Sequence, residues 1–168
     1  MAQFFPITGT GQSLTLTWAS LASDANLLVG RQSAQLTCDW DDYLVSFWVR
    51  AAATGTLTTG RQVQLWAVPS RDTTGTYPSP IVGTGDAAAT WGSADLISAG
   101  AMLINAMATN ATNNQIYTSR PVSLKRQLNV EVLPPKVVFW GVHSMGQPLG
   151  ATGSDHGLYV LPISTEIR

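Results

Sequence analysis

The chain has 168 residues, of which 45% are hydrophobic and 11% are charged, and its formal net charge at pH 7 is −1. This length suits one domain with a buried core. No run of basic residues occurs, so the chain lacks the positive surface that nucleic-acid binding requires, and we expect no nucleic-acid partner. The first residues, MAQFFPITGTGQ, have no basic region and only a short apolar stretch, so we expect neither a signal peptide nor a membrane span.

The low share of charge predicts a surface that is partly covered by neighbouring molecules. Soluble domains average about 25% charged residues. Lysine, which often keeps protein surfaces apart, occurs only at Lys125 and Lys136. The single cysteine, Cys38, cannot form an internal disulfide, which suits a reducing cytoplasm.

Alternation of apolar and polar residues dominates the chain and predicts strands. In residues 14–18, Leu14, Leu16 and Trp18 share one face and two threonines share the other, as in a half-buried strand. In residues 43–50, Leu44 and Trp48 lie opposite an apolar face, which predicts burial on both sides. Further strands are expected over residues 34–40, 61–68, 101–108, 115–124, 136–144 and 157–163.

One short helix is expected within residues 90–100, with Ser93 as its N-cap. About eight strands separated by Gly, Pro, Thr and Asn clusters predict an all-β fold, a two-sheet antiparallel sandwich with jelly-roll-like wiring. We expect a single sandwich domain over residues 13–168, preceded by an N-terminal arm over residues 1–12.

Two segments predict contacts outside the sandwich core. The arm contains Phe4, Phe5 and Ile7, which no local hairpin would bury. The connection over residues 69–90 is long for a compact domain and carries Tyr77 and Ile81. We expect these five side chains to form an interface with a partner protein or a neighbouring copy of the chain. For the connection, the chain's own surface is the alternative.

The stretch GATGSDHGL (150–158) places Ser154, Asp155 and His156 side by side. In a strand, Ser154 and His156 would point to one face and Asp155 to the other, and the sequence has no G-x-S-x-G nucleophile motif. We therefore expect a structural turn rather than catalysis, formed by Gly150, Gly153, Asp155, His156 and Gly157. In this interpretation the glycines supply permissive backbone angles and His156 fixes the loop. A hydrolase that uses this turn is the competing hypothesis.

No metal site or cofactor is expected. His143 lies among apolar residues and is interpreted as a core or interface group. The acidic cluster of Asp39, Asp41 and Asp42 lacks the glycine turn and terminal glutamate of a calcium loop, which favours a solvated turn between strands.

Six tryptophans leave a second function open. Trp48, Trp66 and Trp140 lie in alternating strands and are interpreted as core or sheet-face packing residues. For Trp18, Trp40 and Trp91 the sequence leaves both packing and exposure open. Exposed indoles stack on sugar rings, so the alternative function is a carbohydrate- or host-binding module.

Three stretches together carry a family resemblance: YLVSFWVRAAATGTLTTGRQVQLWAV, then YPSPIVGTGDAAATW, then LPPKVVFWGVHSMGQPLGATGSDHGLYV. Their order resembles a family of tailed-phage virion structural proteins. That family has a YLVSG…TTG strand, an R-Q strand that ends in Trp, a YPD-like loop, a W-G strand and a terminal G-x-T-G-x-(D/N)-H turn. The resemblance runs from Asp42 to Ile163, and residues 1–41 depart from it.

The resemblance implies a jelly-roll-like decoration or cement protein of the phage head that is not an enzyme. With exposed indoles, the alternative that it implies is a carbohydrate- or host-binding module of a phage tail or fibre. It implies binding to the major capsid protein, localisation on the capsid surface of a virion assembled in the host cytoplasm, and no membrane partner. Because the chain is poor in charge, we also expect a symmetric homo-oligomer, a trimer, on the particle.

Overall fold

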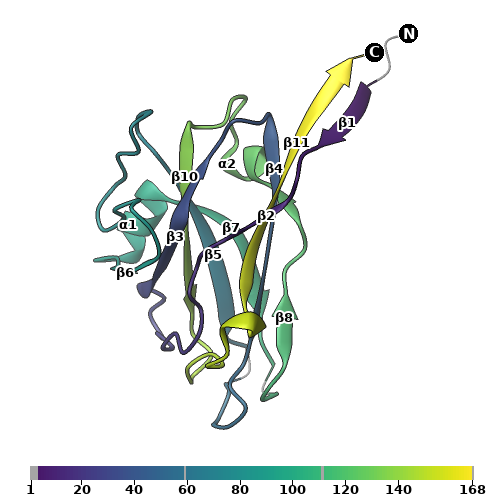
Figure 1. Cartoon of the computed structure of the whole chain (residues 1–168). Helices are drawn as coiled ribbons and strands as arrows, with labels where there is room; N and C mark the ends of the chain where they lie inside the picture. Colours follow the sequence, from purple (N-terminus) through teal and green to yellow (C-terminus); the bar gives the residue numbers. More distant parts are fainter. Residues whose placement is uncertain (1–3, 59, 111, 168) are drawn as a thin grey trace.

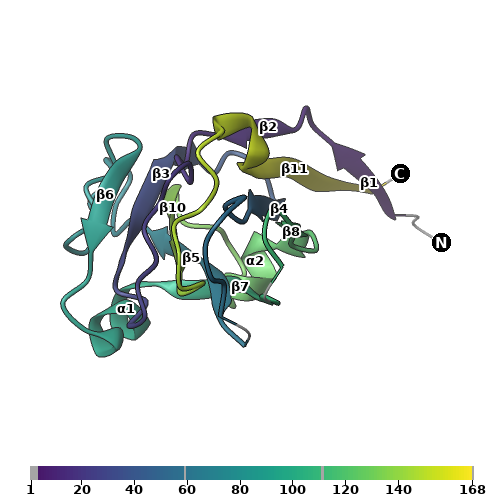
Figure 2. The same ribbon diagram turned by 90° about the horizontal axis from the view of Figure 1, so that it is seen from below.

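In a computed structural model, which describes residues 4–58, 60–110 and 112–167, two antiparallel β-sheets pack face to face as a sandwich (Figures 1 and 2). The expected all-β sandwich is therefore confirmed. The described residues form eleven strands, two short α-helices, α1 (Ala94–Gly100) and α2 (Leu124–Leu128), and one 3-10 helix, η1 (Gly153–Asp155).

Sheet A has six strands in the described part of the chain. Its main order is β1-β11-β4-β8, while β2 pairs with β11 and β9 pairs with β4. The strands are β1 (Phe4–Thr8), β2 (Gln12–Leu14), β4 (Asp42–Arg50), β8 (Ile116–Thr118), β9 (Val122–Ser123) and β11 (Gly157–Ile167).

Sheet B has five strands in the order β6-β3-β10-β5-β7. Among the described strands, the chain changes sheet at six connections: β2–β3, β3–β4, β4–β5, β7–β8, β9–β10 and β10–β11. Most consecutive strands therefore lie in opposite sheets. The strands are β3 (Val29–Thr37), β5 (Gln62–Pro69), β6 (Ala87–Thr90), β7 (Met102–Ala108) and β10 (Lys136–His143).

The main core lies between the two sheets and follows the alternation of the sequence. Every second residue of β4, from Tyr43 to Val49, is at most 1% exposed, and Val63 and Leu65 face them from β5. Leu44 and Trp48, on the outer face of β4, are half-buried. Trp18 stacks on Phe47 with ring centroids 5.8 Å apart, so the segment after β2 closes one side of this core.

A second apolar cluster covers the outer face of sheet B. Trp140 of β10 meets Trp91 edge to face, with centroids 6.2 Å apart, and Ile97 of α1 packs in the same cluster. Figure 1 shows α1 and β6 on this side of the molecule. Strand β10 is therefore buried on both faces, as its continuous run of apolar residues requires.

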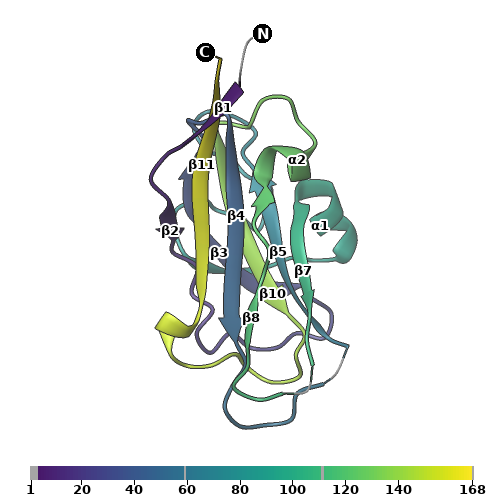
Figure 3. The ribbon, with the colours of Figure 1, turned by 90° about the vertical axis from the view of Figure 1, so that its right-hand side faces the viewer.

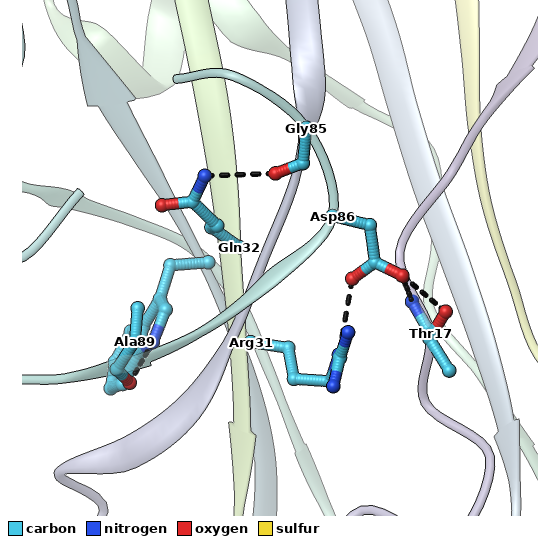
Figure 4. A network of polar contacts seen from close by, with 7 residues as sticks. Thr17, Arg31, Gln32, Gly85, Asp86 and Ala89 are labelled. Atoms are coloured by element: carbon cyan, nitrogen blue, oxygen red, sulfur yellow. Dashed lines mark hydrogen bonds and ion pairs between the residues drawn. The ribbon is translucent and has the colours of Figure 1, made fainter. Parts of the chain in front are cut away.

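Polar contacts hold the long connection before β6 against sheet B (Figure 4). Asp86 accepts a bond from Arg31 Nε at 3.1 Å and further bonds from the amide and hydroxyl of Thr17. The fully buried amide of Gln32 donates to the carbonyl of Gly85 at 2.8 Å and accepts from the amide of Val82 at 3.0 Å. These bonds satisfy polar groups in a segment that has little regular structure.

Several local expectations need correction. The strand expected over residues 14–18 ends at Leu14. Leu16 and Trp18 are buried, which answers the question that the sequence left open for Trp18. Residues 15–18 bond to their neighbours individually rather than in a ladder. Residues 115–124 form two strands instead of one, and α2 follows them with Ser123 as its N-cap. The short helix with Ser93 as N-cap is confirmed, since Ser93 Oγ accepts from the amide of Leu96 at 3.3 Å.

The two ends of the described chain form a ribbon that projects from the sandwich (Figures 1 and 3). In this ribbon β1 pairs with residues 163–167 of β11, from Thr8 opposite Ile163 to Phe4 opposite Ile167. Strand β4 pairs with β11 only from Gly157 to Ile163. We name this two-stranded segment, residues 4–8 and 163–167, the terminal ribbon.

Candidate functional site

The root of the terminal ribbon is fixed by close contacts at two glycines. A Cβ on Gly9 would lie 2.7 Å from Pro162 Cγ and 2.8 Å from the Trp40 ring, and a Cβ on Gly11 would overlap the Tyr159 ring. The amide of Gly9 also donates to the carbonyl of Pro162 at 3.0 Å. The G-T-G sequence at residues 9–11 therefore lets aromatic side chains cross the backbone where the ribbon leaves the sandwich.

A hollow of about 450 Å³ lies between the ribbon root and α2, lined by Thr8, Leu44, Lys125 and Ile163 among others. The hydroxyl of Ser164 donates to Asp41, which ties the ribbon to the turn between β3 and β4. Asp42 accepts from the amides of Tyr43 at 2.7 Å and Lys125 at 2.8 Å. The carboxylates expected in a solvated turn thus position the ribbon root and the start of α2.

An apolar groove of about 200 Å³ opens at the same end of the sandwich. It is lined by Pro69, Met102, Leu128, Val130, Val132 and Pro134. Val132 is 82% exposed and Met102 is 42% exposed, so apolar side chains stand open to solvent there. The strand register shows that the groove lies at this end. Pro69, the last residue of β5, pairs with Val137, and the adjacent Lys136 pairs with Thr37, the last residue of β3. After Thr37 the chain enters the turn between β3 and β4, beside the ribbon.

The five side chains expected at an interface fall into two groups. Phe4, Phe5 and Ile7 belong by their backbone to β1, while their side chains lie outside the described part of the structure. Tyr77 and Ile81 are 8% and 4% exposed and pack in the second apolar cluster of this same chain. These two side chains therefore pack against the surface of their own chain, which is one of the two possibilities that the sequence left open for residues 69–90.

The turn before β11 is held by the imidazole of His156. Its Nδ1 accepts from the amide of Arg50 at 3.1 Å, and its Nε2 donates to the carbonyl of Gly150 at 2.8 Å. The Arg50 guanidinium also pairs with Asp155, with 3.3 Å between nitrogen and oxygen. Both ring nitrogens are thus occupied by main-chain groups, whereas a general base for Ser154 would need one of them free.

The glycines of this turn act by a different physical cause from the one expected. None of Gly150, Gly153 and Gly157 has a φ between +20° and +160°, so permissive backbone angles do not explain them. Gly157 instead lies under the indole of Trp48, which a Cβ would overlap. Around Gly153 no atom lies within 4 Å of a Cβ position, so that glycine meets no steric constraint.

His143 is fully buried, and its Nε2 donates to the carbonyl of Leu21 at 2.9 Å. Burial lowers the pKa of both His143 and His156 below the ordinary value of 6.5. Among the described residues, no group of three or more His, Cys, Asp or Glu side chains is placed to hold a metal ion.

The six tryptophans form two groups by exposure. Trp18, Trp91 and Trp140 are at most 2% exposed, while Trp40, Trp48 and Trp66 are half-buried. Trp140 packs in the second apolar cluster, and Trp66 packs against that cluster while half-buried. Trp48 lies half-buried on the outer face of sheet A. Alternation alone did not show which face of a strand another layer covers.

Comparisons of the chain with protein-family models, with curated proteins and with solved structures found no match. Within the described residues, no helix has the length and apolar character needed to cross a membrane.

Proposed function

We propose that the chain is a decoration, or cement, protein of a tailed-phage head, which binds the assembled shell and stabilises it through buried surface without a chemical step. The motif order from Asp42 to Ile163 supports this proposal through its resemblance to virion structural proteins. The antiparallel sandwich is compatible with it but hosts many functions, so the argument depends on the surface of the molecule.

The terminal ribbon is the observation that carries the proposal. Beyond Ile163, the strand partner described for β11 is β1 alone, and β1 has the apolar sequence FFPIT. An isolated two-stranded ribbon is marginally stable in water, because it has too few faces to bury. A ribbon that leaves the body of its own domain is therefore suited to packing on another protein.

The proposed partners are the major capsid protein and further copies of this chain in a trimer. The apolar groove beside Val132 lies at the ribbon end of the sandwich, so both features can meet one surface. A standard interface buries about 1,200–2,000 Å² in total, and repetition by symmetry multiplies its effect on the shell. The low share of charge, 11%, lowers the desolvation cost of such contacts.

The test is deletion of residues 1–8, which removes β1 but keeps Gly9 and Gly11 under their aromatic neighbours. We expect a folded domain with cooperative thermal unfolding that no longer cosediments with undecorated heads. Deletion of residues 1–3 is the matched control and should retain binding. Unchanged occupancy of heads after deletion of residues 1–8 would contradict the proposal.

The oligomer is tested separately, by cryo-electron microscopy of decorated heads. Density for this chain should cluster around the symmetry axes of the shell with contacts between copies. Isolated copies without mutual contact would refute the trimer, while density on a tail or fibre would refute decoration of the head.

A further inference from the structure

A second groove, of about 290 Å³, lies beside the start of β11 and has a different chemistry. Its lining includes the half-buried indole of Trp48, the exposed residues Ser13 and Thr15, and the buried indole of Trp18. The lining has no Asp, Glu, Lys or Arg. The groove therefore presents an aromatic surface and hydroxyl groups without a formal charge.

The backbone of β11 explains why an indole is available in this groove. Trp48 stands opposite Gly157 in the antiparallel register of β4 and β11. Because Gly157 has no side chain, the six-membered ring of Trp48 lies across the β11 backbone, where any Cβ would overlap it. Glycine at this position thus sets the direction of the indole in the groove.

The polar groups in the groove can both donate and accept hydrogen bonds. Ser13 and Thr15 are exposed, and each hydroxyl can do either. The indole N–H of Trp18 is buried and has no acceptor among the described residues. This N–H is closed to solvent, so the exposed hydroxyls of Ser13 and Thr15 are the groups that a ligand in the groove can reach.

We propose that this groove binds a neutral carbohydrate, with one sugar ring stacked on the indole of Trp48. The face of an indole is electronegative and attracts the weakly positive C–H groups on the apolar face of a sugar ring. Ser13 and Thr15 bind sugar hydroxyls at the rim. A neutral ligand fits the lining better than a charged one, since no counter-charge is present there.

The carbohydrate site is independent of the proposed attachment to heads. Strand β11 runs from Gly157, beside the groove, to Ile167 in the terminal ribbon, which is a distance of about 33 Å for an extended strand. A chain attached through its ribbon would leave the groove open. Glycan binding by the purified protein is therefore measured without heads and can succeed or fail whether or not decoration is correct.

The experiment is an NMR titration of the purified protein that follows the indole N–H signals of its six tryptophans. The probes are the methyl glycosides of glucose, galactose and N-acetylglucosamine, with tetra-alanine as the peptide probe. We expect at least one glycoside to shift the Trp48 signal saturably. Absence of a saturable shift with all three, or a saturable shift with tetra-alanine alone, would overturn the proposal.

Two variants locate the binding. Trp48→Ala should weaken the binding of the responding glycoside by about fivefold or more. The matched control is Trp66→Ala, which removes another half-buried strand tryptophan, one that is not in the lining of the groove, and should bind normally. Thr15→Val keeps the shape of an exposed residue and should also weaken binding, so the proposal remains testable if Trp48→Ala unfolds. Equal affinity of Thr15→Val and the original chain would count against it.

Discussion

The amide of Arg50 donates to His156 Nδ1 over 3.1 Å and so joins two residues 106 positions apart in the chain. The other ring nitrogen of His156 donates to the carbonyl of Gly150 at 2.8 Å. One imidazole therefore fixes the end of β4 to the turn that precedes β11. We therefore predict that His156 contributes to the stability of the fold.

Replacement of His156 should thus affect stability, and replacement of Ser154 should not. His156→Ala leaves the amide of Arg50 and the carbonyl of Gly150 without their partner, which should lower the free energy of unfolding by about 1–2 kcal/mol. Ser154 is exposed, and Ser154→Ala should change the free energy of unfolding by less than about 0.5 kcal/mol. Urea denaturation measures both. A hydrolytic activity that disappears in Ser154→Ala at unchanged stability would instead support the enzyme hypothesis.

Valine at Gly157 should be far more damaging than valine at Gly153. A Cβ at residue 157 overlaps the Trp48 indole, and overpacking of this kind costs about 1–3 kcal/mol. At residue 153 the same position has no neighbour within 4 Å, so Gly153→Val is the matched control. Thermal unfolding followed by circular dichroism compares the two variants. Similar melting temperatures would show that the contact with Trp48 imposes no constraint.

Acid should destabilise the protein in the range where histidine titrates. Burial lowers the pKa of His143 and of His156 below 6.5; for His156 the nearby Arg50 acts in the same direction, and Asp155 and the bond to Gly150 oppose it. The unfolded chain then binds protons at a pH where the folded chain does not. The free energy of unfolding should be highest above pH 6.5 and should fall as the pH drops below it.

Denaturant titrations between pH 5 and pH 8 test this dependence. In His156→Asn, the free energy of unfolding should change less steeply with pH. Asp24 and Asp72 have pKa values below the ordinary 3.8, so their contribution is lost only at lower pH. A free energy of unfolding that stays constant from pH 8 to pH 5 would contradict the lowered pKa values of His143 and His156.

Cys38 should resist alkylation in the folded protein. Burial, and secondarily the charge of Asp39, raises the pKa of this thiol to about 12, and the thiolate is the reactive form. At pH 8, iodoacetamide should therefore modify the folded chain much more slowly than the chain in 6 M guanidinium chloride, as mass spectrometry would show. Equal rates in both conditions would indicate an accessible thiolate.

Sequence patterns predicted the parts of this fold that local periodicity determines. Alternation from Tyr43 to Val49 gave the inner face of β4, and the side chain of Ser93 gave the start of α1. Pairing over long separations could not be predicted in this way. The pairing of β1 with the end of β11 depends on how the chain returns in space.

The candidate sites show the same division. The turn at His156 was expected, but its partner Arg50 lies 106 residues away and has no local signal. The need for glycine at residue 157 comes from the Trp48 ring on the adjacent strand and not from the backbone angle of the glycine itself. Tyr77 and Ile81 are apolar residues in a long connection, and only the packed structure shows which surface they contact.

The place of β11 in sheet A sets an order for folding during synthesis. The five strands of sheet B end at His143, so all of them leave the ribosome before Gly157 does. Sheet A joins β1, β2 and β4 through β11, and these strands cannot be assembled until that last strand emerges. Until then, the core lacks Leu158 and Val160 of β11, and β1 and β2 lack the strand with which they pair. This is the stage at which chaperone binding or aggregation competes with folding.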